Sequence, residues 1–452
     1  MRELIVVLGS VVFVTARWLP AAARRWAAAG AAAVVLIGAV TLLPDPRWQM
    51  LVVLAADLLT GLGWLLARRR RVRWWLALPA TLGCLALVVG GGVAAWALPV
   101  PVFPPPYGPS PVGTTVAQWT DPGRDEPGTP ETGDRRTVVV QLWYPAREAG
   151  SGARYLGRTR PEAEAVAAGE ARYLGVPAAA LSALPRAHSH ATSGAPPADG
   201  RFPVVLFSPG LGSVRSQNTA WAEDLASRGY LVAGIDHPFD SAAVVLADGR
   251  TVRTRIAATG DPAEDERRRT RWTQVRADDL RFVLSRLGDP AGGPLVGRAD
   301  TRRVAATGHS IGGAAAMRAA EQDSRITAVI NLDGGLNPGQ GPVRQPVLAL
   351  THDATGKAGA AYLARLASVL DRGAAAGYRL TVPGSAHLTF TDAPLFLPPV
   401  PSVAGSLGRT ESIRVTAQIT AAFLDATLRD RPIDLPSELA RHGDLHIHRP
   451  AT

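Results

Sequence analysis

The 452-residue chain is 47% hydrophobic, carries a formal net charge of +10 and contains one cysteine. Its length allows one large domain with an accessory region. The first hundred residues hold ten arginines against three acidic residues. Most of the net positive charge therefore lies in this N-terminal region, where arginines are a signal for the orientation of membrane helices. The rest of the chain has too little excess positive charge to indicate a nucleic-acid surface. The single Cys84 excludes a disulfide framework and a cysteine-based zinc site.

Four apolar stretches occupy the N-terminal region, at about residues 4–16, 26–43, 49–67 and 74–98. A membrane span needs about 20 apolar residues, so the last three are long enough and the first is short. Arginines separate the first stretch from the second, and the segment Arg68–Arg73 separates the third from the fourth. Short arginine-rich loops stay in the cytoplasm. This predicts about four transmembrane helices over residues 1–98, with everything after Leu98 on the extracytoplasmic side of the cell membrane. The isolated Asp57 is expected to face the helix bundle and not to mark an ion path.

A proline-rich segment, LPVPVFPPPYGPSPVG, follows the last apolar stretch. We expect residues 99–134 to form a semi-rigid linker and a lead-in segment. Two polar regions, 150–200 and 237–272, interrupt the pattern that follows. We interpret them as insertions that shape the mouth of a pocket.

From residue 135 to residue 452, apolar strand-like runs alternate with helical patterns. Near-continuous apolar runs are typical of a parallel sheet covered on both faces, and their alternation with helices predicts a doubly wound α/β domain. The predicted strands cover residues 136–145, 202–208, 230–236, 302–308, 326–333, 346–352 and 378–384.

The sequence Gly308-His309-Ser310-Ile311-Gly312 is the one G-x-S-x-G pattern in the chain. A predicted strand enters it and an alanine-rich helical pattern leaves it. This context is typical of a sharp strand-to-helix turn that exposes a nucleophilic serine, with small residues on both sides. We therefore predict that Ser310 is a nucleophile.

A serine nucleophile needs hydrogen-bond donors for the developing oxyanion. The backbone N–H of Ile311, which follows the serine, is the first predicted donor. The loop LFSPGLGS follows an earlier strand and contains glycines that let the backbone approach a substrate. We predict that the backbone N–H of Leu211 in this loop is the second donor.

The order serine, acid, histidine in this architecture requires a histidine on a late loop. His387 in VPGSAHLTF meets this requirement. His352 comes too early for the base, and His237 precedes the serine and is expected to have a structural role. Two acids fit: Asp353 in LTHDATG is at the more usual position, and Asp333 in INLDGGL lies one strand earlier. Spacing leaves both open.

The soluble part resembles a known family over about residues 107–400. The resemblance rests on YGPSPVGTT, VVQLWYPA, VVLFSPGLGS, DLASRGYLVAGIDH, GHSIGGAAA, NLDGG and GSAHLTFTD, in that order. These motifs are similar to those of the platelet-activating-factor acetylhydrolase group of α/β-hydrolases, including its bacterial members. The resemblance implies an α/β-hydrolase fold with Asp333 as the acid, His387 as the base and Leu211 and Ile311 as oxyanion donors. One departure is Pro209, where the family often has histidine.

The predicted function is a serine ester hydrolase that forms an acyl-enzyme and uses no metal and no organic cofactor. The resemblance implies a short-acyl phospholipid or another lipid-like ester as substrate. Alternatives are a general carboxylesterase or cutinase-like polyester hydrolase and, from another class, a membrane sensor whose hydrolase domain only binds. No nucleic-acid partner is expected, and the oligomeric state is left open.

Overall fold

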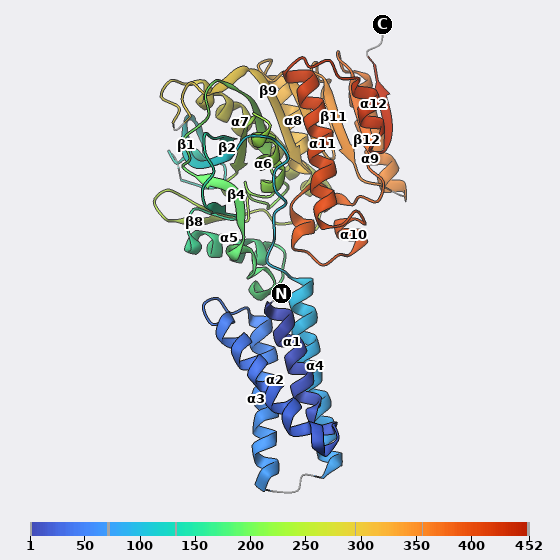
Figure 1. Cartoon of the computed structure of the whole chain (residues 1–452). Helices are drawn as coiled ribbons and strands as arrows, with labels where there is room; N and C mark the ends of the chain where they lie inside the picture. Colours follow the sequence, from blue (N-terminus) through green and yellow to red (C-terminus); the bar gives the residue numbers. More distant parts are fainter. Residues whose placement is uncertain (1, 70–72, 132, 294, 355, 450–452) are drawn as a thin grey trace. The chain divides into compact units, whose positions relative to one another are not determined.

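The computed structural model describes residues 2–69, 73–131, 133–293, 295–354 and 356–449. The chain forms two compact units with a boundary between Pro99 and Val100 (Figure 1). Among the described residues, the N-terminal unit contains helices and the turns between them, and all the strands lie in the C-terminal unit.

The N-terminal unit contains four α-helices: α1 (Arg2–Thr15), α2 (Ala21–Leu42), α3 (Trp48–Arg69) and α4 (Trp74–Ala97). Three segments among the described residues are long and apolar enough to cross a membrane: Ala21–Leu42, Trp48–Leu66 and Trp74–Ala97. The first apolar stretch does form a helix, but its 14 residues rise only about 21 Å at 1.5 Å per residue, less than a hydrocarbon core of about 30 Å. Length and composition therefore support three of the about four predicted spans. The predicted loop Arg68–Arg73 lies partly outside the described residues.

Polar contacts hold the short α1 inside the N-terminal unit. Ser10 of α1 donates a hydrogen bond of 2.7 Å to the Asp57 carboxylate of α3, and both side chains are buried. Glu3 pairs with Arg47 over 2.7 Å. Asp57 thus faces the helix bundle, as expected. Large apolar side chains on the longer helices point outward instead, including Leu36, Ile37, Leu58 and Trp96.

An eleven-stranded sheet forms the centre of the C-terminal unit, in the order β13-β12-β11-β10-β9-β5-β6-β2-β1-β4-β3. The six strands from β12 to β6 are parallel, while β13 and β2 join them antiparallel. A separate hairpin pairs β7 with β8. The strands are β1 (Val112–Asp125), β2 (Arg135–Pro145), β3 (Gly152–Arg154), β4 (His188–Ser193), β5 (Phe202–Ser208), β6 (Leu231–Asp236), β7 (Ala243–Val245), β8 (Thr251–Arg253), β9 (Ala299–His309), β10 (Ala328–Leu332), β11 (Val347–Thr351), β12 (Gly377–Thr381) and β13 (Asp444–His448).

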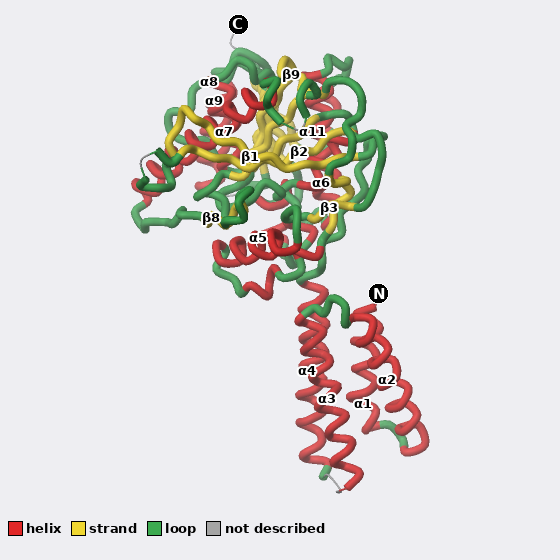
Figure 2. The backbone as a smooth tube through the Cα atoms, turned by 90° about the vertical axis from the view of Figure 1, so that its left-hand side faces the viewer, coloured by secondary structure: helices red, strands yellow, loops and turns green. Residues whose placement is uncertain are grey.

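Helices cover both faces of this sheet, as Figure 2 shows for α7, α8 and α9 on one side and α6 and α11 on the other. Each face has its own buried apolar cluster, which explains why the central strands are apolar on both faces. The helices are α5 (Arg160–Tyr173), α6 (Thr219–Ser227), α7 (Pro262–Gly288), α8 (Ile311–Gln322), α9 (Gly356–Asp371), α10 (Pro401–Ala404), α11 (Arg409–Leu428) and α12 (Leu435–Ala440).

The sheet contains strands that the sequence did not predict. β1 lies in the segment interpreted as linker and lead-in, β4 lies in the first insertion, and β13 ends the sheet. Their sequences alternate polar and apolar residues or are polar throughout, because they lie near or at the edges of the sheet and are partly exposed. The parallel order of β9, β10, β11 and β12 brings the loops after these strands to one edge.

Candidate active site

The chain turns sharply at Ser310, between β9 and α8. Ser310 has φ 56° and ψ −123°, a conformation that residues other than glycine rarely adopt and that costs about 1–3 kcal/mol. Ser310 is partly exposed, while its neighbours His309 and Ile311 are buried. The fold therefore presents this one serine at the end of a buried strand.

Two glycines permit the turn because the end of β5 packs directly against it. A Cβ on Gly312 would lie 1.9 Å from the carbonyl oxygen of Ser208, and a Cβ on Gly308 would lie 2.5 Å from the same oxygen. Both distances are far shorter than a van der Waals contact. The spacing G-x-S-x-G thus follows from the approach of the Ser208 carbonyl to both sides of the turn.

Asp333 follows β10, the strand next to β9. Its side chain is buried, and its backbone has φ 54°. Its Oδ2 accepts a hydrogen bond of 2.6 Å from Nδ1 of His387, a residue that begins a short 3₁₀ helix and is exposed. Asp353 is also exposed, and it makes no hydrogen bond to a histidine in the described part of the chain. The structure thus brings His387 together with Asp333 and not with Asp353.

A second histidine shares the same carboxylate. His352 donates from Nδ1 to Oδ2 of Asp333 over 2.7 Å, and the Tyr362 hydroxyl donates to Oδ1 over 3.1 Å. Burial by itself would raise the pKa of Asp333, but the hydrogen bonds from His352 and His387 outweigh burial and hold this pKa well below its usual range. Asp333 is therefore a carboxylate at neutral pH, with both oxygens occupied.

Asp333, His352 and His387 are also close enough to hold one metal ion, since their ligand atoms lie within 4.8 Å of one another. The Nδ1 atoms of both histidines and the shared Oδ2 are engaged in the hydrogen bonds just described. These contacts are complete without an ion. The absence of a metal requirement stays a prediction.

The predicted oxyanion donors flank the turn. The N–H of Gly210 donates to the Gln217 side chain over 2.8 Å, whereas the N–H of Leu211 has no acceptor within the described residues. Ile311 is the first residue of α8, where a backbone N–H has no intrahelical acceptor. Within the part of the chain that the structure describes, neither the Leu211 nor the Ile311 N–H group therefore has a hydrogen-bond acceptor.

His309 links the three loops of the site. Its Nε2 lies 2.8 Å from the backbone oxygen of His387, and its Nδ1 lies 3.3 Å from the Gln217 amide nitrogen. Burial lowers the pKa of His309 to about 3, so the ring is neutral. It then donates through Nε2 and accepts at Nδ1. Since Gln217 also binds Gly210, these contacts join the predicted oxyanion loop LFSPGLGS, called the oxyanion loop below, to the turn at Ser310 and to the loop that carries His387.

A cleft of about 670 Å³ adjoins the oxyanion loop and includes Leu211 in its wall. The two predicted insertions supply most of the remaining wall, through the end of α5, the strand β8 and the start of α7. Aromatic and apolar side chains line it together with three arginines and one acid: Tyr173, Ile256, Trp272, Arg172, Arg253, Arg269 and Asp265. A larger cavity of about 840 Å³ lies within the N-terminal unit. Ser310, Asp333 and His387 are not among the lining residues of either cavity.

Sequence reasoning did not identify Gln217, His352 or Tyr362 as parts of this site. The position of His352 held a usable signal, because it ends the predicted strand 346–352, and Asp333 ends the preceding predicted strand, 326–333. Parallel neighbours end at the same edge of a sheet, so residues after them come close together. Gln217 and Tyr362 lie within a loop and a helix, where no pattern marks them.

Replacing His352 by glutamine tests the shared carboxylate. The hydrogen bond to Asp333 raises the pKa of His352 in the folded state, so its charged form stabilises the fold below the unfolded pKa of about 6.5. This stabilisation is lost as pH rises through the raised folded pKa. We expect His352→Gln to lower the melting temperature more at pH 5.5 than at pH 9. An equal decrease in melting temperature at both pH values would contradict an ion pair between His352 and Asp333.

Comparison with known proteins gives the family of this chain. A family model described as "Platelet-activating factor acetylhydrolase, isoform II" matches residues 103–280 and 294–434. A probable 1-alkyl-2-acetylglycerophosphocholine esterase of Arthroderma benhamiae is 31% identical over 150 residues, which cover 32% of this chain and 36% of that protein. The platelet-activating factor acetylhydrolase of Cavia porcellus is 31% identical over 159 residues, again 36% of its length. The match therefore spans little more than a third of these relatives.

A solved structure gives a longer match. The ferulic acid esterase of Streptomyces cinnamoneus aligns with a TM-score of 0.63 and 32% identity, over 78% of this chain and 100% of that one. The mostly parallel sheet with flanking helices and this structural match confirm the predicted α/β-hydrolase fold. Since the family model covers well over half of the sequence, the chain belongs to the platelet-activating factor acetylhydrolase isoform II family.

Proposed function

We propose that this protein is a carboxylic ester hydrolase in which Ser310 is the nucleophile. The observation that carries the proposal is the strained, accessible Ser310 on the same sheet edge as the buried Asp333 and its 2.6 Å hydrogen bond to His387. An exposed histidine oriented by a buried carboxylate is the arrangement that activates a serine hydroxyl. The family and the esterase structural match support the same chemistry.

In the proposed mechanism His387 removes the Ser310 proton as the hydroxyl attacks the ester carbonyl. Asp333 orients the imidazole through Nδ1 and stabilises its cation. The N–H groups of Leu211 and Ile311 stabilise the oxyanion of the tetrahedral intermediate. His387 then protonates the leaving alcohol, and the acyl-enzyme is hydrolysed by a water molecule that the same histidine activates.

The cleft beside Leu211 supports a lipid-like substrate. It combines aromatic side chains with basic ones, and neither Arg172 nor Arg253 has an ion-pair partner among the described residues. Such a surface suits an ester with an apolar chain and a phosphate, and we propose a short-acyl phospholipid or a similar ester. A general carboxylesterase or cutinase-like hydrolase is the second candidate, favoured by the aromatic Tyr173 and Trp272 and by the similarity to a ferulic acid esterase.

We further propose that the N-terminal unit anchors the enzyme in the cell membrane, with the hydrolase unit on the extracytoplasmic side. The apolar exterior of α2, α3 and α4 supports insertion. The side is inferred from the arginine-rich segment between α3 and α4, which is expected to stay in the cytoplasm. This inference does not depend on α1, because α4 alone leads from that segment to the hydrolase unit.

The acid assignment is tested by two matched substitutions. Asp333→Asn removes the charge that orients and stabilises the His387 imidazolium, so kcat should fall by about 10³–10⁴-fold. Asp353→Asn should change kcat by less than about twofold, because Asp353 is exposed and does not contact the histidine. Steady-state hydrolysis of p-nitrophenyl acetate measures both. The opposite ranking would transfer the acid role to Asp353.

The nucleophile and the substrate class are tested together on the full-length protein in detergent micelles. A fluorophosphonate should label Ser310 and fail to label Ser310→Ala. Hydrolysis of acetylated phospholipid should exceed that of neutral p-nitrophenyl esters and polyester film in kcat/KM. Labelling with a preference for the neutral esters would favour the general carboxylesterase. No labelling of the wild type would favour a protein that only binds.

Membrane orientation is tested with two topology reporters fused after Leu98. Alkaline phosphatase is active only outside the cytoplasm and should be active here, whereas a green fluorescent reporter of cytoplasmic folding should stay dark at the same site. The same pair fused after Arg69 should give the reverse result, since that position belongs to the segment expected in the cytoplasm. Cytoplasmic signals at both sites would contradict the orientation.

A further inference from the structure

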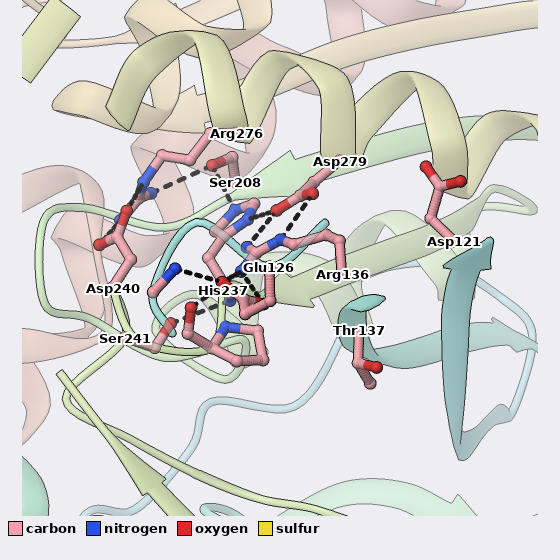
Figure 3. A network of polar contacts seen from close by, with 12 residues as sticks. Asp121, Glu126, Arg136, Thr137, Ser208, His237, Asp240, Ser241, Arg276 and Asp279 are labelled. Carbon is pink, nitrogen blue, oxygen red and sulfur yellow. Dashed lines mark hydrogen bonds and ion pairs between the residues drawn. The ribbon is translucent and has the colours of Figure 1, made fainter. Parts of the chain in front are cut away.

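A second series of serine, histidine and aspartate contacts, Ser208–His237–Asp279, lies buried at the end of β5 (Figure 3). Ser208 Oγ is 2.9 Å from Nε2 of His237, and Nδ1 of His237 is 2.8 Å from the Asp279 carboxylate. All three residues have 0% exposure. No substrate can reach this serine, so the series is not a second catalytic site. Its position points to a different role.

Each hydrogen bond in the Ser208–His237–Asp279 series has a defined donor. Burial, with the nearby Arg276 charge, lowers the pKa of His237 to about 4, so the ring is neutral. Burial would raise the pKa of Asp279, but the charge of Arg136 outweighs it, and Asp279 stays ionised. Nδ1–H of His237 therefore donates to Asp279, and Nε2 accepts from the Ser208 hydroxyl. The Ser208 oxygen is left to accept from Arg276 over 3.2 Å.

Arg276 of α7 connects this series to the oxyanion loop. Its guanidinium donates to the backbone oxygen of Pro209 over 2.5 Å and to that of Gly210 over 3.2 Å. Asp240 holds the other side of the guanidinium through two contacts of 2.6 Å. Arg276 is completely buried, so these contacts form in a low-dielectric interior where hydrogen bonds to a charge are strong.

The contact with Gly210 fixes the direction of the oxyanion donor. The Gly210 C=O and the Leu211 N–H belong to one planar trans peptide, in which they point in opposite directions. Because Arg276 binds the C=O from the buried side, the Leu211 N–H points away from the core. The peptide between Pro209 and Gly210 is fixed in the same way. Its C=O, from Pro209, accepts a hydrogen bond from Arg276, and its N–H, from Gly210, donates one to Gln217.

The same network places the loop relative to the serine turn. The Ser208 hydroxyl is held by His237 and Arg276, while the Ser208 carbonyl packs against the glycines around Ser310, 1.9 Å from where a Gly312 Cβ would lie. Movement of Ser208 would therefore shift the Leu211 donor with respect to Ile311. Oxyanion stabilisation requires both donors at about 2.7–3.1 Å from one oxygen.

We propose that Arg276, held by Asp240 and by the Ser208–His237–Asp279 series, is a positioning residue that sets the Leu211 N–H for oxyanion binding. The proposal rests on the ester hydrolase function proposed above. If the proposal is correct, loss of the Arg276 guanidinium weakens binding of the transition state. Ground-state binding of the ester then stays nearly unchanged.

The main test is Arg276→Lys, which keeps the charge beside Asp240 but cannot bind Pro209, Gly210 and Ser208 together. Full-length variants in detergent are assayed with a p-nitrophenyl ester and with an alkyl boronic acid that mimics the tetrahedral intermediate. We expect kcat to fall by about 10²–10³-fold, as for loss of one oxyanion donor. The affinity for the boronic acid should fall in parallel, and KM should change by less than about threefold.

Two further variants separate positioning from general destabilisation. Ser208→Ala removes only the hydroxyl link and should give a smaller decrease in kcat and in boronic acid affinity, again at constant KM. Arg215→Lys is the matched control: this buried arginine is also paired with two acids, Glu162 and Asp236, but it donates no hydrogen bond to Pro209 or Gly210 in the described part of the chain. This substitution should lower the melting temperature, but it should not lower kcat selectively at constant KM.

The outcomes distinguish this proposal from the function on which it rests. If Arg276→Lys keeps wild-type kcat and boronic acid affinity, the positioning role is wrong even though the enzyme hydrolyses esters. If Arg276→Lys does not fold, unchanged kinetics in Ser208→Ala contradict the role in the same way. If the wild type itself neither hydrolyses esters nor reacts with fluorophosphonate, the proposed function fails first.

Discussion

The geometry of the candidate site depends on one close contact, the packing of the Ser208 carbonyl against the glycines on either side of Ser310. This contact excludes any Cβ at Gly308 or Gly312, the two residues that flank the strained turn at Ser310, whose backbone conformation costs about 1–3 kcal/mol. It also fixes the distance between the end of β5, which leads to Leu211, and the start of α8, which carries Ile311. The oxyanion loop and the serine turn are therefore positioned as one unit.

Buried charged residues hold the oxyanion loop and the serine turn in place. Burying Arg276, Asp240, His237 and Asp279 is costly unless every donor and acceptor is paired, and here the contacts extend without interruption from the strand end to α7. On the opposite side, Asp333 accepts hydrogen bonds from His352, His387 and Tyr362. The accessible Ser310 and His387 thus rest on residues that are fixed by buried polar contacts, which is the pre-organisation that acyl transfer needs.

The central fold was predictable from the sequence because its signals are local. Continuous apolar runs gave the parallel strands β5, β6, β9, β10, β11 and β12 with boundaries close to those observed. The partly polar β1, β4 and β13 lacked such runs. The first apolar stretch was recognised as short, and it forms the 14-residue helix α1, whereas the three longer stretches form helices long enough to cross a membrane.

The candidate residues were predictable only in part. The G-x-S-x-G pattern and the late histidine identified Ser310 and His387, but spacing left Asp333 and Asp353 open, and only the family resemblance selected Asp333. Arg276 gave no signal, because an arginine in a charged helical segment reads as a surface residue. Its proposed role depends on tertiary contacts with a loop 66 residues away in the sequence. A local sequence pattern cannot predict such contacts.

The most direct test of this account is a crystal structure of the Ser310 adduct formed with an alkyl phosphonate, whose tetrahedral phosphorus mimics the acylation intermediate. The account predicts that one phosphonyl oxygen lies about 2.7–3.1 Å from the backbone nitrogens of both Leu211 and Ile311. It also predicts that Nε2 of His387 lies within hydrogen-bond distance of the Ser310 oxygen while Nδ1 stays on Asp333. A phosphonyl oxygen that points away from both nitrogens, or a His387 paired with another acid, would contradict it.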